Sequence, residues 1–171
     1  YPGYVPVAST RRIPITLPPT QAASFLEIPV DMDARVKELA MGVIGTETDP
    51  QQKALLLHQY MRENFKYTLA QPAGASEDPL WAFLFDVKAG HCEYFAAAYG
   101  MLLRVVGIPS RIVGGYQGGA WDESSQIAVF TGKNAHAWVE WLHPNHGWIT
   151  DDPTPVVTIT PPSLTGWSAY L

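Results

Sequence analysis

The sequence predicts an α+β domain with helices packed on an antiparallel sheet. Three observations support this. Apolar residues recur at helical spacing between residues 31 and 106, and they alternate with polar residues between 111 and 152. Helical segments come first and strand-like segments follow, which is the order typical of an α+β architecture. The length of 171 residues suits one domain with its own core.

Three helices are expected in the first half of the chain. The first covers about residues 31–44. The second has Asp49 as its N-cap, followed directly by a proline at the first helical position. The third follows Gly90 and continues to about Val106, where glycine and proline end it. Residues 81–87 are apolar but too few for periodicity to separate helix from strand.

Four strands are expected after the third helix, because the apolar period changes to two. They cover residues 111–117, 127–131, 135–142 and 148–152. A turn at 144–147 joins the last two, which predicts a hairpin. The loop 118–125 contains acidic residues and a tryptophan, and it is either solvated surface or a cover for a site.

The two ends of the chain are rich in proline, which favours extended, irregular backbone. We therefore divide the chain into an extended N-terminal segment (1–23), a catalytic domain (24–156) and a C-terminal tail (157–171). The chain begins with Tyr1 rather than Met, which suggests a piece of a longer protein.

Charge and composition exclude several classes of function. The net charge is -5, and no basic run is longer than Arg11–Arg12, which argues against a nucleic-acid partner. No apolar run is long enough for a membrane span, and no secretory signal opens the chain. Cys92 is the single cysteine, so an internal disulfide and a cysteine-rich zinc site are both excluded.

Cys92 is the candidate nucleophile. It lies at the predicted start of the third helix, where free backbone N–H groups and the helix dipole stabilise an anion. The same N–H groups can hold the oxyanion formed by attack on a carbonyl. Gly90 is expected to let the backbone turn tightly there and to let substrate approach. Without this context, a single cysteine is more often a buried structural thiol.

His136 is the candidate base among five histidines, because it lies in an alternating strand between small residues. The alternative for a strand histidine is a half-exposed polar residue. A hairpin turn near Pro144 makes paired residue numbers add to about 288, which places Asp152 opposite His136. A register shifted by one residue places Asp151 opposite His136 instead. Neighbours on a strand face opposite sides, so at most one of the two aspartates can orient the histidine.

Other side chains are weaker candidates. Tyr67 and Trp81 can donate a hydrogen bond to an oxyanion, although core packing is the commoner role for each. His143 and His146 flank the turn and suggest a metal site together with Cys92 or His136. A His-x-x-His turn alone does not supply the three or four ligands that zinc needs.

Four segments resemble motifs of the transglutaminase-like superfamily. They are the cysteine motif Gly90–Ala96, the following Leu103–Tyr116, the histidine motif Asn134–Glu140 and the aspartate motif Gly147–Thr154. In that pattern the catalytic aspartate directly precedes Pro-Thr, so the resemblance implies a triad of Cys92, His136 and Asp152. Many relatives carry aspartate where this chain has Asn134, which is not a triad position.

The stretches Leu26–Tyr67 and Asp78–Phe85 resemble the bacterial membrane-anchored branch of the superfamily, the TgpA-like proteins. In that branch the domain is extracytoplasmic and lies between membrane spans. The resemblance implies the same location for this piece, which we expect to be a soluble monomer.

The resemblance implies acyl transfer through a Cys92 thioester on a peptide or carboxamide, with no metal and no cofactor. The partner is then a protein or peptide substrate. Water as acyl acceptor gives a protease or amidase, and an amine gives a transglutaminase; the triad is the same for both. We favour hydrolysis, because water outcompetes amines unless the groove excludes it. The alternative is a catalytically silent peptide-binding module.

Overall fold

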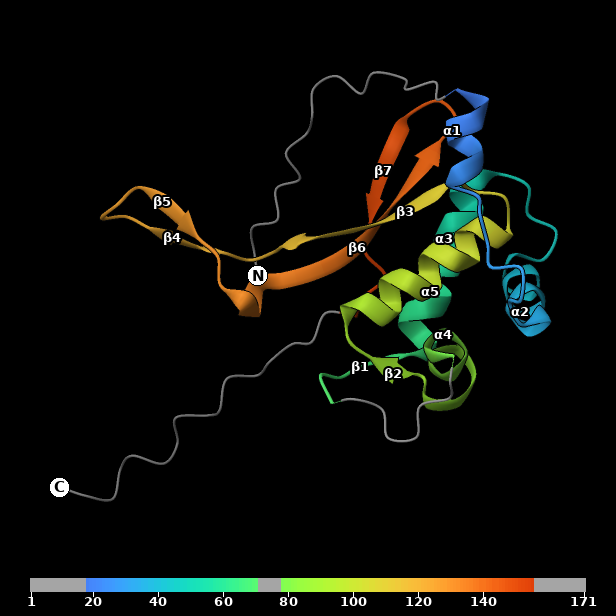
Figure 1. Ribbon diagram of the computed structural model, residues 1–171, viewed down its shortest axis with the longest axis horizontal. Coiled ribbons are helices and arrows are strands. Elements are labelled where there is room, and N and C mark those ends of the chain that lie inside the picture. The colour runs from blue at the N-terminus through green and yellow to red at the C-terminus, as the bar shows by residue number, and fades with distance from the viewer. Residues whose placement is uncertain (1–17, 71–77, 156–171) are drawn as a thin grey trace.

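Helices occupy the first half of the chain and a three-stranded antiparallel sheet occupies most of the second, as the change of apolar period predicts (Figure 1). The computed structural model describes residues 18–70 and 78–155. Most of the N-terminal segment and the whole tail 157–171 therefore lie outside the described residues, and the domain limits 24–156 stay a prediction.

The three expected helices are present with nearly the expected ends. They are α2 (Ala34–Ile44), α3 (Pro50–Asn64) and α5 (Cys92–Val105). The Asp33 side chain caps α2 by accepting from the Arg35 amide at 2.8 Å. Asp49 caps α3 by accepting from the Gln52 amide at 2.9 Å, as its position before a proline predicts.

Three short elements depart from the expectation. Residues Pro19–Ser24 form the helix α1, within the segment that we expected to be extended. Proline at the first helical position suits a helix start, and the alanines that follow favour helix. Residues 79–87 form α4 (Pro79–Trp81) and then a π-helix (Ala82–Val87), in which the Lys88 amide bonds to the Phe83 carbonyl five residues back.

Two strands of two residues each, β1 (Lys66–Tyr67) and β2 (Ala89–Gly90), pair in parallel directly before α5. They were not predicted, because two residues show no periodicity. Their pairing joins the end of α3 to the segment that precedes Cys92, so it holds the start of α5 in place.

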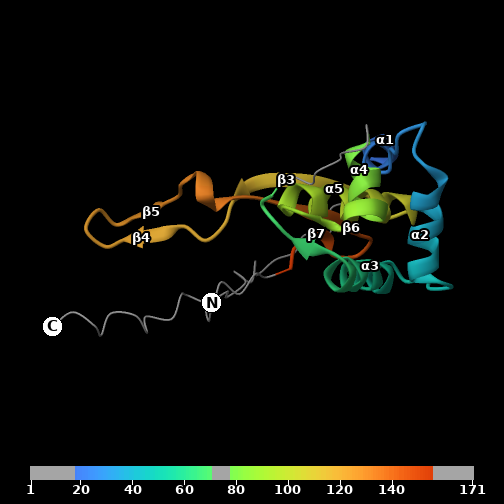
Figure 2. The ribbon, with the colours of Figure 1, turned by 90° about the horizontal axis from the view of Figure 1, so that it is seen from below.

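The main sheet has the order β3-β6-β7, with β3 (Ser110–Tyr116), β6 (Ala135–His143) and β7 (Gly147–Asp151) all antiparallel. Between β3 and β6 the chain forms a separate hairpin of β4 (Ala120–Asp122) and β5 (Ile127–Val129). This hairpin projects away from the rest of the domain and does not fold back over the helices (Figure 2). It contains most of the loop 118–125.

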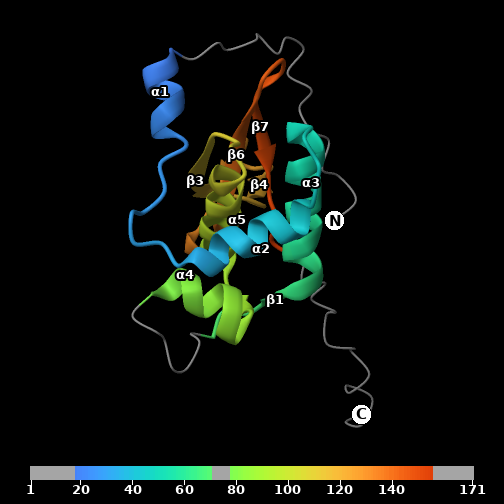
Figure 3. The same ribbon diagram turned by 90° about the vertical axis from the view of Figure 1, so that its right-hand side faces the viewer.

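Helix α5 is the centre of the core. It contacts β3 and β6 of the sheet, and it also contacts α2 and α3 (Figure 3). Phe95, Tyr99, Leu57 and Val139 at this junction are completely buried. Burial of a side chain of this size stabilises the fold by roughly 1.5–3 kcal/mol. Among the described residues, no helix has the length and apolar character needed to span a membrane.

Candidate active site

Cys92 is the first residue of α5, and it is 9% exposed. His91 is the N-cap, and its carbonyl accepts from the Tyr94 amide at 3.0 Å. The first N–H groups of a helix have no acceptor within the helix, so those beside Cys92 are available to an anion. The structure therefore places the sulfur where the sequence predicted it, at the positive end of a 14-residue helix.

Gly90 does not make the tight turn that we expected. Its backbone is not among the positive-φ glycines of the described residues, and it pairs with Tyr67 in the β1–β2 ladder. A Cβ at this position would lie 2.9 Å from a ring carbon of Tyr94. Gly90 is needed for close packing of the Tyr94 ring rather than for a tight turn.

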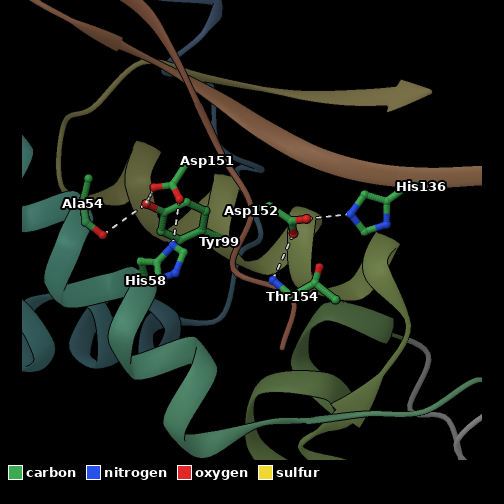
Figure 4. A network of polar contacts seen from close by, with 7 residues as sticks. All are labelled: Ala54, His58, Tyr99, His136, Asp151, Asp152 and Thr154. Carbon is green, nitrogen blue, oxygen red and sulfur yellow. Dashed lines mark hydrogen bonds and ion pairs between the residues drawn. The ribbon is translucent and has the colours of Figure 1, made fainter. Parts of the chain in front are cut away.

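His136 and Asp152 form a close pair (Figure 4). The distance from His136 Nε2 to Asp152 Oδ2 is 2.6 Å, and the two side chains are 15% and 30% exposed. The other carboxylate oxygen, Oδ1, accepts from the Thr154 amide at 3.0 Å. Because Nε2 is directed to Asp152, Nδ1 is the ring nitrogen that remains for a reacting partner.

The hairpin register differs from the expected one. Paired residue numbers in β6 and β7 add to 290, as in Val139–Asp151, because the turn is centred on Asn145 rather than Pro144. Asp152 therefore lies beyond the last ladder pair and not opposite His136. It still reaches the ring, because the chain leaves the ladder there and Pro153 is buried.

Cys92 and His136 lie at the same end of the domain. Gly100 of α5 faces Val139 of β6, and the Pro109 carbonyl after α5 accepts from the Leu142 amide at 2.8 Å. Helix and strand therefore run in the same direction. From Gly100 back to Cys92, eight helical residues span about 12 Å. From Val139 back to His136, three strand residues span about 10 Å. Cys92 therefore lies level with His136.

A cleft of about 480 Å³ opens beside the His136–Asp152 pair. Its lining includes Arg62 from α3, Tyr116 and Gln117 at the end of β3, and Trp138. The Trp138 ring stacks near His136, with 6.2 Å between ring centroids. Cys92 is not part of this lining.

Tyr67 lies close to Cys92, and Trp81 does not share that position. Tyr67 pairs with Gly90, two residues before Cys92. Burial raises the pKa of Tyr67, and the charge of a Cys92 thiolate raises it further. Trp81 instead covers the Arg35 guanidinium, 4.9 Å from the ring centroid. Of the two candidate oxyanion donors, Tyr67 is the one near the sulfur.

The structure argues against a metal site formed by His143 and His146 with Cys92 or His136. His143 and His146 lie side by side at the turn, with 4.4 Å between ring centroids. His143 is seven strand residues from His136, a distance of about 24 Å. In residues 18–70 and 78–155, no group of three histidine, cysteine or acidic side chains is arranged to hold a metal.

Asn134 connects the projecting hairpin to the site. Its amide donates to the carbonyls of Gln117 (3.2 Å) and Gly118 (2.9 Å), and its Oδ1 accepts from the Thr131 amide at 2.9 Å. A carboxylate has no N–H to donate, so the aspartate of many relatives cannot make the first two bonds. The departure from the family pattern therefore has a structural role in this chain.

Comparison with known proteins gives the family. The model of the transglutaminase-like superfamily matches residues 37–153, which is more than half of the chain. The chain belongs to the transglutaminase-like superfamily. It is 38% identical over 130 residues to a protein-glutamine gamma-glutamyltransferase of Pseudomonas aeruginosa, covering 75% of this chain. It is 34% identical over 138 residues to the uncharacterized protein YebA of Bacillus subtilis, covering 76% of this chain. It spans 19% of each of these relatives.

Solved structures agree with this assignment. The periplasmic domain of TgpA from Pseudomonas aeruginosa superimposes with a TM-score of 0.74 at 35% identity, covering 81% of this chain and 48% of that one. A Cytophaga hutchinsonii protein described as a candidate cysteine protease has a TM-score of 0.55 at 22% identity, covering 78% and 42%. The second likeness concerns the fold alone. The transglutaminase-like fold that the motifs implied is confirmed.

Proposed function

We propose that this domain is a thiol-dependent acyl-transfer enzyme that acts on peptide or carboxamide bonds. Cys92 is the nucleophile, His136 the base and Asp152 the group that orients the base. The observation that carries the proposal is the 2.6 Å His136–Asp152 pair at the end of the domain where α5 begins with Cys92. The Pseudomonas relative is a protein-glutamine gamma-glutamyltransferase, which supports a glutamine carboxamide as the acyl donor.

In the proposed reaction each step is carried out by a named group. His136 takes the thiol proton at Nδ1, and the sulfur attacks the carbonyl carbon. The Cys92 N–H and the Tyr67 hydroxyl hold the oxyanion. His136 then gives the proton to the leaving amine, which is ammonia when the donor is glutamine, and a thioester remains. An acceptor, water or an amine, attacks the thioester while His136 accepts its proton, and the sulfur leaves as a thiolate. His136 then returns the proton to the sulfur, which regenerates the thiol.

One observation favours a second function, a peptide-binding module without turnover. Cys92 is largely buried and does not line the cleft beside His136. A module of this kind needs the cleft but not the thiolate. The state of the thiol therefore separates the two functions.

Alkylation of Cys92 by iodoacetamide is followed against pH, and the midpoint of its rate profile is compared with that of free cysteine. The thiolate is the reactive form, so we expect Cys92 to react faster than free cysteine at about pH 6. In His136→Ala we expect the profile to approach that of free cysteine. Mass spectrometry of the intact protein gives the rates.

His146→Ala is the matched control, because His146 is exposed at the far end of β6 and its loss should leave the profile unchanged. A wild-type midpoint near that of a free thiol, unaffected by His136→Ala, contradicts the proposal and supports the binding module.

The acyl acceptor is tested by incubating the protein with a glutamine peptide and a labelled primary amine. We expect hydrolysis to exceed amine incorporation, because the Asp152 side chain is 30% exposed and water reaches the pair. The deamidated and the amine-linked peptides differ in mass, so one spectrum gives both yields. Amine linkage that dominates at millimolar amine contradicts this expectation and makes the domain a transglutaminase in practice.

We further propose that the domain is an extracytoplasmic part of a larger, membrane-anchored bacterial protein. The solved TgpA structure is a periplasmic domain, which supports this location. Protease treatment of spheroplasts that carry the full-length protein tests it, since the domain must then be cut without lysis.

A further inference from the structure

A second carboxylate lies directly beside the proposed triad. Asp151 precedes Asp152 in the chain, and both of its oxygens have partners (Figure 4). His58 Nδ1 of α3 donates to Oδ1 at 2.7 Å, and the Tyr99 hydroxyl of α5 donates to Oδ2 at 2.6 Å. The Tyr99 hydroxyl also lies 3.1 Å from the Ala54 carbonyl oxygen. Asp151 thus joins two helices to the end of one strand.

Asp151 lies at the end of β7, directly before the residue that contacts His136. β7 is an edge strand of the sheet, and Val139–Asp151 is its last ladder pair with β6. Neighbouring residues of a strand point to opposite sides. Asp151 points toward the helices and Asp152 toward His136, as Figure 4 shows. Beyond Asp151 the ladder no longer holds the backbone that carries Asp152.

The network keeps Asp151 ionised in a largely enclosed place. Burial raises the pKa of Asp151, but the hydrogen bonds from His58 and Tyr99 and the charge of His58 outweigh it, so the pKa lies below its usual value. Burial and the Asp151 charge raise the pKa of Tyr99 well above its usual value, so its hydroxyl remains a donor. Tyr99 itself is completely buried, which fixes where that donor lies.

We propose that Tyr99 and His58 are positioning residues of the acyl-transfer reaction, acting through Asp151 to hold Asp152 at His136. This inference rests on the proposed function. Charge-assisted bonds from two packed helices restrain the Asp151 backbone, and Asp152 is the next residue. Asp152 keeps Oδ2 on His136 Nε2 only while that backbone stays in place. The two carboxylates have different roles. Both oxygens of Asp151 are bound by groups of the helices, so Asp152 is the carboxylate that contacts His136.

One part of this network, the inward-facing position of His58, could be predicted from the sequence. His58 is four residues after the buried Ala54 and three before the buried Met61, so it lies on the inner face of α3. A titratable group on an inner helical face needs a partner. The sequence does not identify that partner, because Asp151 on β7 is 93 residues away along the chain.

The test measures the pH midpoint of Cys92 alkylation in Tyr99→Phe, His58→Ala and His58→Asn. Loosening Asp152 weakens its support of the imidazolium and thereby of the thiolate. We expect the midpoint in Tyr99→Phe and His58→Ala to move toward that of His136→Ala, with an alkylation rate at pH 6 that is about three- to tenfold lower than in the wild type. His58→Asn keeps a donor where Nδ1 lies and is expected to retain the wild-type midpoint.

Two control variants remove similar groups elsewhere. Tyr60→Phe deletes a tyrosine hydroxyl on α3, and Ser110→Ala deletes a buried hydrogen bond to Gly100 of α5 at 2.8 Å. His136 and Asp151 line the cleft together with three other charged or titratable groups, which are Arg62, Tyr116 and Asp152. Neither control removes any of these groups. Both controls should leave the midpoint unchanged, even where urea shows lower stability.

The outcomes separate the two proposals. An ordinary wild-type midpoint overturns the proposed function. An activated wild-type thiol whose midpoint is the same in Tyr99→Phe and His58→Ala overturns the positioning role and leaves the network purely structural. If a variant is poorly folded, the imidazole N–H proton between His136 and Asp152, observed by NMR in its folded fraction, gives the answer. An unshifted signal again contradicts the inference.

Discussion

Asp152→Asn is expected to lower kcat by about 10³- to 10⁴-fold while the fold stays intact. The two oxygens of the carboxylate are already assigned in the structure. Oδ1 accepts from the Thr154 amide, so the asparagine oxygen must stay there, and its NH₂ group then faces His136 Nε2. A donor facing Nε2 forces that nitrogen to be the acceptor and moves the ring proton to Nδ1. Nδ1 is the atom that must take the thiol proton, so the base is in the wrong tautomer.

Turnover of the glutamine peptide measures this effect, and urea unfolding checks the fold. Asp31→Asn is the matched control, because it removes the same charge from an exposed position before α2. We expect Asp31→Asn to keep wild-type kcat, and both variants to unfold at similar urea concentrations. A kcat of Asp152→Asn within tenfold of the wild type means that Asp152 does not set the tautomer.

The residues of the proposed site were predictable because each has a local signal. Cys92 lies two residues after a glycine at a helix start, and His136 lies in a clear alternation. Asp152 was chosen over Asp151 by the family resemblance, in which the catalytic aspartate directly precedes Pro-Thr. The helices that carry the core were predictable for the same reason, since the caps Asp33 and Asp49 and the apolar stripes are local. Local signals therefore identify the elements and the chemistry-bearing residues.

Relations between distant residues were not predictable in the same way. The register was off by two residues, because nothing in the alternation shows whether the turn centres on Pro144 or Asn145. The positive φ of Gly147, which begins β7, is consistent with the later centre. The contacts of Asp151 with His58 and Tyr99 depend on how two helices pack against one strand, which no window of sequence shows. The supporting contacts of the site therefore emerge only from the structure.

Phe95→Ala is expected to lower the free energy of unfolding by about 3–5 kcal/mol. Phe95 lies in the first turn of α5, three residues after Cys92, and is completely buried. Its ring packs edge-on against Phe83 of the π-helix, with 5.1 Å between centroids, and against Phe65 at 6.4 Å. These rings support the helix start that carries the sulfur, so their loss leaves a cavity beneath it.

Urea unfolding of Phe95→Ala, Phe83→Ala and the double variant measures both the cost and the coupling. Because the rings touch, we expect the double variant to lose about 0.5–1.5 kcal/mol less than the two single losses together. Phe95→Leu keeps most of the volume and supplies a folded sample if the alanine variant is too unstable. Phe130→Ala is the control, since Phe130 is 49% exposed and its loss should change stability by less than about 0.5 kcal/mol. Equal costs for Phe95→Ala and Phe130→Ala would show that the aromatic cluster does not hold the start of α5.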